Sequence, residues 1–258
     1  MASHETPSIQ SLDRGLLILE MVGKSSSPVS LGHLTTILGI DRSSVFRLAN
    51  TLKRRGFLAQ PSSGKDYVLG PSVWRLSRSY DWSNMLATVA HDQLKSLAAL
   101  TNETAHLAVR EGRSALFVDH ASSTHVIAIS GQTGEHVPIY CSAHGKALLA
   151  DFEENDLKTF LGDKPLKVYT KKTINNIKGL TTACAEIKKK GYATDDGEYL
   201  LGVRCVAAPI RDRDGAVIGS IGISAPITRF PESRYAECAK HVKESAKQIR
   251  ALIGAQSD

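Results

Sequence analysis

One stretch of the sequence, residues 30–56, constrains the fold of this chain more than any other. It reads SLGHLTTILGIDRSSVFRLANTLKRRG, two short segments with apolar residues at helical spacing, separated by a Leu-Gly-Ile tripeptide. Ser30 and Asp41 stand at helix N-cap positions, and Gly39 and Gly56 stand where helices end. The pattern predicts a helix-turn-helix, although an ordinary pair of surface helices would have a similar sequence.

The second predicted helix has one apolar stripe and one polar face. Val45, Leu48 and Leu52 form the stripe. The opposite face carries guanidinium, hydroxyl and amide groups, which suit phosphates and base edges in a DNA major groove. That face consists of Arg42, Ser43, Arg47, Asn50, Thr51 and Arg54, and Ser30, Ser44 and Lys53 complete the candidate DNA-binding residues of the helix pair.

A predicted hairpin follows the helix pair. Residues 57–60 and 67–70 read as short strands around a Ser-Gly turn, and residues 12–23 read as a helix before the pair. Three helices and a hairpin form a winged helix-turn-helix. Lys65 and Ser63 of the hairpin could then reach the DNA backbone or minor groove.

The positive charge of the chain is concentrated near its N-terminus. The net charge is +6 over 258 residues, and residues 1–80 contribute +5, with 10 Lys and Arg against 5 Asp and Glu. The remaining residues hold 22 basic and 21 acidic side chains. A basic third joined to a near-neutral remainder fits a DNA-binding module attached to a domain with another task.

Several other classes of protein are not expected. No apolar run approaches the ~20 residues that span a bilayer, and the first ten residues lack the features of a signal peptide, so we expect a cytoplasmic protein. The four cysteines form no CxxC pair, and no two of the histidines between residues 120 and 144 share a helical face. We therefore expect free thiols, no metal site and no cofactor.

The rest of the chain alternates between helical and strand patterns. Residues 71–100 are helical with a break near Asp81, which favours either a linker with a dimer surface or a helix packed on its own chain. The mixture predicts an α+β fold with an antiparallel sheet covered by helices on one or both faces. Strands are expected at 105–109, 114–119, 126–129, 206–210 and 217–224, and helices at 142–150, 153–161, 176–190 and 232–253.

Three stretches together resemble the IclR family of bacterial transcription regulators. The first is SLDRGLLILE with the helix-turn-helix that follows it, and the second is HVPIYCSAHGKALLA. The third is GYATDDGEYLLGVRCVAAPIRDRDGAVIGSIGISAP. They occur in the family's order, and the resemblance covers nearly the whole chain.

This resemblance implies a complete domain organisation and a function. It implies a disordered arm (1–8), a winged helix-turn-helix domain (9–70), a helical linker (71–83) and a GAF-like effector-binding domain with an antiparallel sheet (84–258). Such proteins are homodimers or dimers of dimers that bind double-stranded operator DNA. They repress or activate catabolic operons under the control of a small organic acid or aromatic metabolite, often carboxylated, and we expect this chain to be a repressor.

The resemblance also implies where the effector binds. By matching the family's motifs, the candidate effector-binding residues are Ser142, Ala143, His144, Gly145, Asp195, Glu198, Cys205 and Ser224. The residues allow other readings: His144 could be a surface histidine, Asp195 a turn residue and Cys205 a small core residue. Lys146 could pair with an acid instead of touching ligand.

The chain departs from the family pattern at two positions. Gly197 stands where the family often has an acidic residue, and Gly222 stands where a serine often binds the effector carboxylate. Losing that hydroxyl disfavours the simplest oxo-acids and leaves room for a bulkier or less polar ligand.

Two other functions compete with a ligand-controlled regulator. An enzyme would need a nucleophile and base, such as Cys141 with His144, or an acid and base, such as Asp195 with Glu198. Proximity in sequence shows no such arrangement, so we expect no catalysis. An architectural DNA-binding protein without effector would leave the residues after the linker without a task.

Overall fold

A computed structural model describes residues 9–61, 64–77, 81–162 and 164–255. The chain divides into two compact units, Met1–Asp81 and Trp82–Asp258, each with its own core. The predicted disordered arm of residues 1–8 and Ser63 of the predicted hairpin lie outside the described residues. No helix among the described residues is long and apolar enough to cross a membrane.

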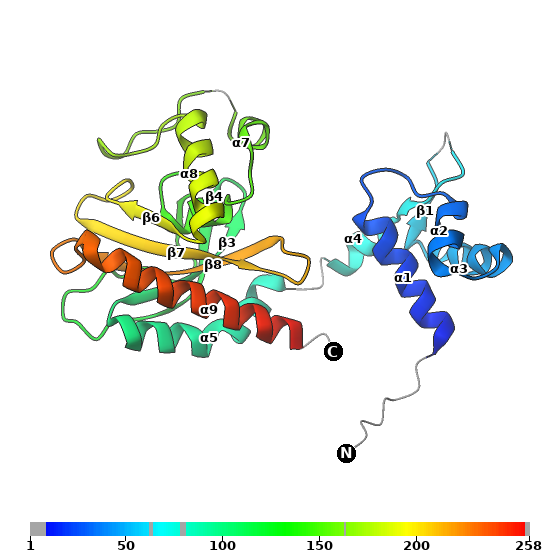
Figure 1. Cartoon of the computed structure of the whole chain (residues 1–258), viewed down its shortest axis with the longest axis horizontal. Helices are drawn as coiled ribbons and strands as arrows, with labels where there is room; N and C mark the ends of the chain where they lie inside the picture. Colours follow the sequence, from blue (N-terminus) through cyan, green and yellow to red (C-terminus); the bar gives the residue numbers. More distant parts are fainter. Residues whose placement is uncertain (1–8, 62–63, 78–80, 163, 256–258) are drawn as a thin grey trace, which may run out of the picture. The chain divides into compact units, whose positions relative to one another are not determined.

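The first unit contains the predicted helix-turn-helix and hairpin (Figure 1). Its elements are α1 (Gln10–Lys24), α2 (Leu31–Leu38), α3 (Arg42–Arg54), β1 (Leu58–Ala59), β2 (Val68–Leu69) and α4 (Pro71–Ser77). The predicted caps are confirmed, because Oγ of Ser30 accepts a hydrogen bond from the backbone of His33 (3.2 Å) and Oδ1 of Asp41 accepts one from Ser44 (2.9 Å). Gly39 ends α2 with a left-handed φ of 61°, which glycine adopts without a steric penalty.

A small apolar core holds the first unit together. The hairpin joins it because β1 and β2 pair antiparallel and Val29, before α2, bridges to Tyr67 beside β2. Tyr67 is thereby buried against the helices, which fixes the hairpin beside α3. The core consists of Ile18, Val22, Val29, Leu34, Val45, Ala49, Leu58 and Tyr67.

The second unit is built on a six-stranded sheet in which every neighbouring pair of strands is antiparallel, in the order β5-β4-β3-β8-β7-β6. This confirms the predicted α+β class. The strands are β3 (Thr104–Glu111), β4 (Ser114–Ala121), β5 (His136–Pro138), β6 (Ala193–Asp196), β7 (Val203–Arg211) and β8 (Val217–Pro226). The helices are α5 (Trp82–Thr101), α6 (Ala143–Leu148), α7 (Glu154–Leu161), α8 (Ile177–Lys190) and α9 (Tyr235–Ala255), with a 3₁₀ turn at Glu232–Arg234.

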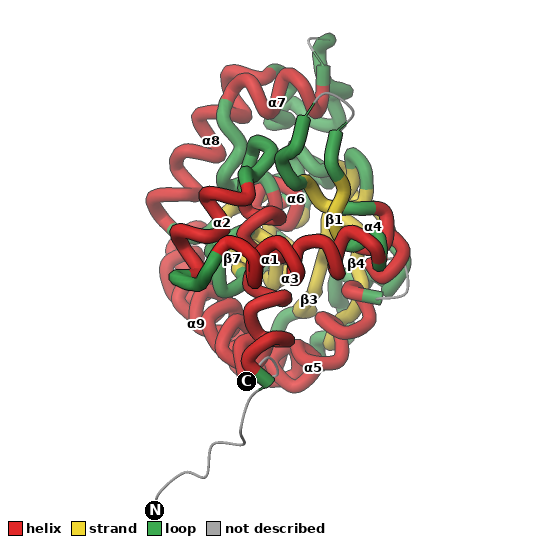
Figure 2. Tube along the Cα trace, turned by 90° about the vertical axis from the view of Figure 1, so that its right-hand side faces the viewer, coloured by secondary structure: helices red, strands yellow, loops and turns green. Residues whose placement is uncertain are grey.

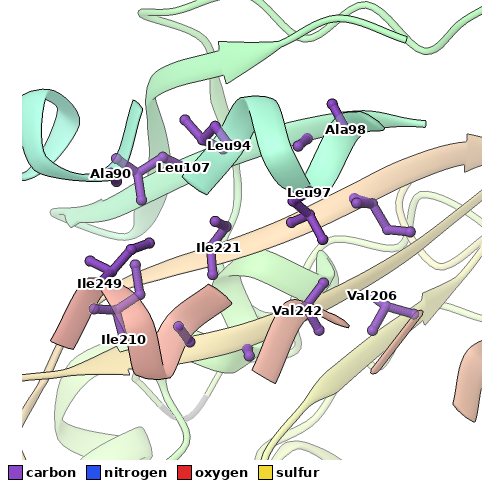
Figure 3. Packing of buried hydrophobic residues seen from close by; sticks show 14 of the residues in the cluster. Ala90, Leu94, Leu97, Ala98, Leu107, Val206, Ile210, Ile221, Val242 and Ile249 are labelled. Carbon is purple, nitrogen blue, oxygen red and sulfur yellow. The ribbon is translucent and has the colours of Figure 1, made fainter. Parts of the chain in front are cut away.

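The two faces of this sheet have different environments. Helices α5 and α9 lie along one face, and α7 and α8 lie on the opposite side (Figures 1 and 2). Leu107, Val206 and Ile221 point from the strands into the core under α5 and α9 (Figure 3). Because side chains alternate along a strand, the neighbouring residues of β3, β7 and β8 point to the face that α6 covers.

One predicted strand is wrong. Residues 126–129 form no strand, and Val126 and Ile127 are exposed. The edge of β4 is already paired with a later segment, because the backbone of Phe117 exchanges hydrogen bonds with Gly134 and Glu135 before β5 begins. A run of four apolar residues without polar alternation does not distinguish an exposed loop from a strand. Strands β5 and β6 were not predicted from the sequence.

Candidate DNA interface and ligand pocket

Helix α3 presents an exposed, cationic surface. The side chains of Arg42, Arg47 and Arg54 are all exposed. None of these three guanidinium groups forms a hydrogen bond or ion pair with another described residue. They are therefore free to bind phosphates or base edges, which the guanidinium fork can contact in pairs.

The other predicted DNA-binding residues of the first unit shape this surface. Oγ of Ser43 donates to Asp41 (2.6 Å), and hydrogen bonds from Ser43 and Ser44 hold the pKa of the Asp41 carboxyl well below its usual range. Oγ1 of Thr51 donates to the backbone of Arg47 (2.8 Å). Ser30 caps α2, as described above.

The base of the hairpin is tied to α3. Nζ of Lys53 donates to the side chain of Gln60 (2.5 Å), whose Nε2 donates to the backbone oxygen of Lys65 (2.6 Å). The ammonium group of Lys65 is on an exposed residue beyond β1. Lys53 thus positions the hairpin, and Lys65 remains available to solvent or DNA.

Helix α1 borders the cationic surface of α3, which was not predicted from the sequence. A groove between α1 and α3 is lined by Ser11 and Arg14 together with Ser44, Arg47 and Thr51. Arg14 therefore stands beside the predicted recognition residues, on the same side of the first unit. The only indication in the sequence was a basic residue, Arg14, in the predicted helix before the helix pair.

A cavity lies in the second unit, on the face of the sheet that α6 covers. It contains six of the eight predicted effector-binding residues: Ser142, Ala143, His144, Asp195, Cys205 and Ser224. The remaining lining residues are His106, Phe117, Ile129, Ser130, Gly131, Glu135, Val137, Tyr199, Leu200 and Val203.

Three of the predicted residues form a row across neighbouring strands. Asp195 pairs with Cys205, and Cys205 pairs with Ser224, so their side chains share one face of the sheet. Sγ of Cys205 donates to Oγ of Ser224 (3.2 Å). Oδ1 of Asp195 accepts the backbone N–H of Glu198 (2.6 Å), and burial raises the pKa of Asp195 to about 7. Asp195 is therefore a strand residue facing the cavity.

Two predicted residues do not line the cavity. Glu198 forms a buried ion pair with Lys146. Of the two roles that the sequence allowed for Lys146, the structure shows the pairing with an acid. Gly145 donates its N–H to Oγ of Ser142 (3.1 Å). A Cβ at Gly145 would lie 2.2 Å from the backbone oxygen of Ile139, so this glycine permits a close approach of backbones.

His144 is buried, not a surface histidine. Its Nδ1 lies 3.0 Å from Oγ of Ser220, and its Nε2 has no hydrogen-bond partner among the described residues. Burial lowers the pKa of His144 to about 4, so the ring is neutral at neutral pH. A neutral imidazole nitrogen without a partner is available to a bound molecule.

Sequence reasoning missed His106, a second buried imidazole in the cavity. Neither of its ring nitrogens has a partner within the described part of the chain. Its ring stacks on Phe117, with centroids 4.5 Å apart and 21° between the planes. Burial, with smaller effects from His144 and His120, lowers the pKa of His106 to about 3. The available signal was one histidine within an apolar strand pattern, Ala105–Val109.

A loop that lines the cavity is held, through Arg229, by a buried carboxylate. Glu103 is 1% exposed and accepts two hydrogen bonds of 2.8 Å from Arg229. Nη1 of Arg229 in turn donates to the backbone oxygen of Ile127 (2.7 Å). Two residues after the cavity-lining Ile129, Gly131 packs so closely that a Cβ there would lie 2.4 Å from Nε2 of His106.

The packing around Gly222 leaves no room for a side chain. A Cβ at Gly222 would lie 2.4 Å from the backbone oxygen of Val206 and 2.7 Å from Cβ of Ala207. Gly222 pairs with His106 across β8 and β3. A serine at this position would therefore require a shift of β7, and the cavity has no hydroxyl there.

Two family models match successive parts of the chain. The IclR helix-turn-helix domain matches residues 11–62, and the model of the bacterial transcriptional regulator IclR C-terminal domain matches residues 81–251. The chain belongs to the IclR family. As a member of this family it is a transcription regulator and not an enzyme, and burial raises the pKa of the Cys141 thiol well above the neutral range, which disfavours a nucleophilic thiolate.

Two curated relatives of this IclR-family chain are named as repressors. The transcriptional repressor IclR of Escherichia coli strain K12 is 32% identical over 251 residues, covering 96% of this chain and 92% of the relative. The repressor AllR of the same strain is 27% identical over 245 residues, covering 95% and 90%. The crystal structure of Thermotoga maritima IclR matches with a TM-score of 0.62 at 28% identity, covering 96% of this chain and all of that one.

Proposed function

We propose that this protein is a cytoplasmic repressor whose affinity for operator DNA is controlled by a small organic catabolic metabolite bound in the second unit. The observation that carries the proposal is the combination of the two sites in one chain. Exposed guanidinium groups lie on α3. A cavity is lined by the buried His106 and His144, which have ring nitrogens without a hydrogen-bond partner among the described residues. The names of the relatives support repression over activation.

In the proposed complex, α3 lies in the major groove of double-stranded DNA. Arg47 reads a base edge, Arg42 and Arg54 bind phosphates, and Lys65 reaches the backbone from the hairpin. Arg14 adds a contact from α1. Two copies of the chain, as a homodimer or within a dimer of dimers, place two recognition helices on a pseudo-palindromic operator.

Ligand control follows from linkage in this proposal. A ligand that binds one arrangement of the dimer more tightly shifts the population toward that arrangement and changes the spacing of the recognition helices. A coupling free energy of ~1–3 kcal/mol would change operator affinity by roughly 5- to 150-fold. In this proposal the second unit is a GAF-like domain that binds the ligand.

The test is a titration of DNA affinity with and without candidate ligands. The operator is first selected from random duplexes with the full chain, and binding is measured by fluorescence anisotropy at fixed salt. The titration is then repeated with a panel of hydroxy acids, keto acids, aromatic acids and phenols. A change of at least about five-fold with one compound class is expected. Tight operator binding that no compound alters would favour an architectural DNA-binding protein instead.

A further inference from the structure

The charges around the cavity do not suit a carboxylate. Among the described residues that line it, none is Lys or Arg, and two, Glu135 and Asp195, are acidic. The ammonium group of nearby Lys146 is bound to Glu198, and the guanidinium group of Arg229 is bound to Glu103. A buried carboxylate without a cation or several donors is strongly disfavoured.

The two histidines of the cavity do not replace the missing cation. Both are buried, His106 to 1% and His144 to 2% exposure, and burial keeps both rings neutral. Protonating either ring to pair with a carboxylate would place a new charge in the interior. Their neutral forms instead offer uncharged hydrogen-bond partners.

The surroundings of His144 indicate which group could form a hydrogen bond with its unpartnered nitrogen, Nε2. Burial lowers the pKa of His144, and a hydrogen bond with the backbone of Ser220 opposes this effect. Nδ1 lies 3.0 Å from Oγ of Ser220, a hydroxyl that can donate or accept, so either ring nitrogen can carry the hydrogen. Nε2 has no partner among the described residues, and a ligand hydroxyl, which both donates and accepts, can pair with it in either tautomer.

The wall beside this nitrogen is aromatic. The ring of His144 meets Phe117 edge-on, with centroids 5.3 Å apart and 80° between the planes. His106 extends the same wall through its stack on Phe117. Tyr199 and Leu200 also line the cavity. Such a surface favours a planar, apolar body over a small polar acid.

We infer that the ligand of this cavity is an uncharged ring compound that carries a hydroxyl group. The ring lies against Phe117, and the hydroxyl forms a hydrogen bond with Nε2 of His144. This inference rests on the proposed ligand control but narrows it to one chemical class. It differs from the carboxylated effector that the family resemblance implies.

Three compounds of one shape test this ligand class on the full chain. They are 4-methylphenol, 4-methylbenzoate and 1,4-dimethylbenzene, in which hydroxyl, carboxylate and methyl replace one another on the same ring. Pyruvate serves as a carboxylate without a ring. By calorimetry at pH 7, 4-methylphenol should bind at least about ten-fold more tightly than each of the others, because it alone supplies a hydrogen-bonding hydroxyl without a charge.

A pair of variants tests whether His144 forms the hydrogen bond with the ligand's hydroxyl group. His144→Leu should weaken 4-methylphenol binding about ten-fold or more and leave 1,4-dimethylbenzene binding unchanged or stronger. His136→Leu is the matched control, because His136 is an exposed histidine on β5 that lies outside the cavity lining. It should change neither affinity. Equal weakening of both ring compounds by His144→Leu would overturn the assigned hydrogen bond.

Operator binding measured with the same compounds separates the inference from the function on which it rests. If 4-methylbenzoate or pyruvate binds more tightly and changes operator affinity, the ligand class is wrong and ligand control stands. If the ring compounds do not bind at millimolar concentration, the inference is overturned. If 4-methylphenol binds as expected but neither it nor the wider panel alters operator affinity, ligand control fails and the cavity's ligand class stands.

Discussion

The α3 surface of the first unit and the cavity of the second unit present polar groups in opposite ways. Arg42, Arg47 and Arg54 are exposed and hydrated, so leaving them unpaired costs little folding free energy. Both ring nitrogens of the buried His106 and Nε2 of the buried His144 have no partner among the described residues, and each such group is costly in the folded protein. A charged surface favours any polyanion, whereas a cavity with fixed, desolvated hydrogen-bonding groups selects one ligand chemistry.

The largest expected effect distinguishes the dense packing of the cavity unit from the open surface of the helix-turn-helix unit. Gly145→Ala should destabilise the second unit by on the order of 3 kcal/mol, because the new Cβ would collide with the backbone of Ile139. Urea unfolding followed by circular dichroism measures the change. Gly15→Ala in α1 is the control, since its Cβ would meet nothing within 4 Å. It should be neutral or stabilise by about 0.5–1 kcal/mol. Equal effects of the two substitutions would remove this contrast.

A second variant tests whether α3 reads sequence or only charge. Arg47→Ala should weaken operator binding by ~1–3 kcal/mol and binding to random DNA by much less, because a base-edge contact is lost. Arg113→Ala is the control, since Arg113 is exposed in the turn between β3 and β4 of the other unit. Anisotropy titrations on both DNAs measure the difference. Equal losses on operator and random DNA would reassign Arg47 to a phosphate contact.

A third variant tests the cost of burying an acid in the cavity. The folded pKa of Asp195, about 7, is above the unfolded value of about 3.9. Between these two pKa values, Asp195 is protonated in the folded protein and ionised in the unfolded chain. The native protein therefore loses free energy of unfolding as pH rises from about 4 to about 7. The Asp195→Asn variant does not lose it, so the free energy of unfolding of this variant minus that of the native protein should rise by at most about 1.4 kcal/mol per pH unit in that window.

Asp196 provides the control for this pH dependence. Its carboxylate pairs with Arg204 and Lys172, whose hydrogen bonds and charges lower its pKa despite the opposing effect of burial. The stability difference between Asp196→Asn and the native chain should therefore stay constant from pH 5 to pH 8. Thermal unfolding at four pH values measures both series. A flat series for Asp195→Asn would show that Asp195 ionises normally.

The smallest expected effect concerns the hairpin. Lys65→Ala should weaken binding to operator and random DNA equally, by less than about 1 kcal/mol, because a phosphate contact carries no sequence information. The slope of log affinity against log salt concentration should fall by about 1. Lys95→Ala, an exposed lysine on α5, should leave both quantities unchanged. A loss confined to the operator would mean that Lys65 reads a groove.

The helix-turn-helix could be predicted because its determinants lie within one short stretch. Ser30, Gly39 and Asp41 act on their own helices, and the polar face of α3 repeats with the period of a single helix. The antiparallel sheet was also predictable in outline, since strand patterns recur at regular intervals. The exposed loop at residues 126–129 was mistaken for a strand because four apolar residues carry no information about the partner strand.

The cavity was decided by tertiary structure. Asp195, Cys205 and Ser224 come together because three strands pair in one register, and the family motifs located them without giving their partners. His106 was missed because nothing near it in sequence shows that its strand lies between β4 and β8. The sequence by itself determined the local helices and the charge of the DNA-binding surface. The register of distant strands decided which polar groups are buried together, because that register depends on packing across the whole sheet.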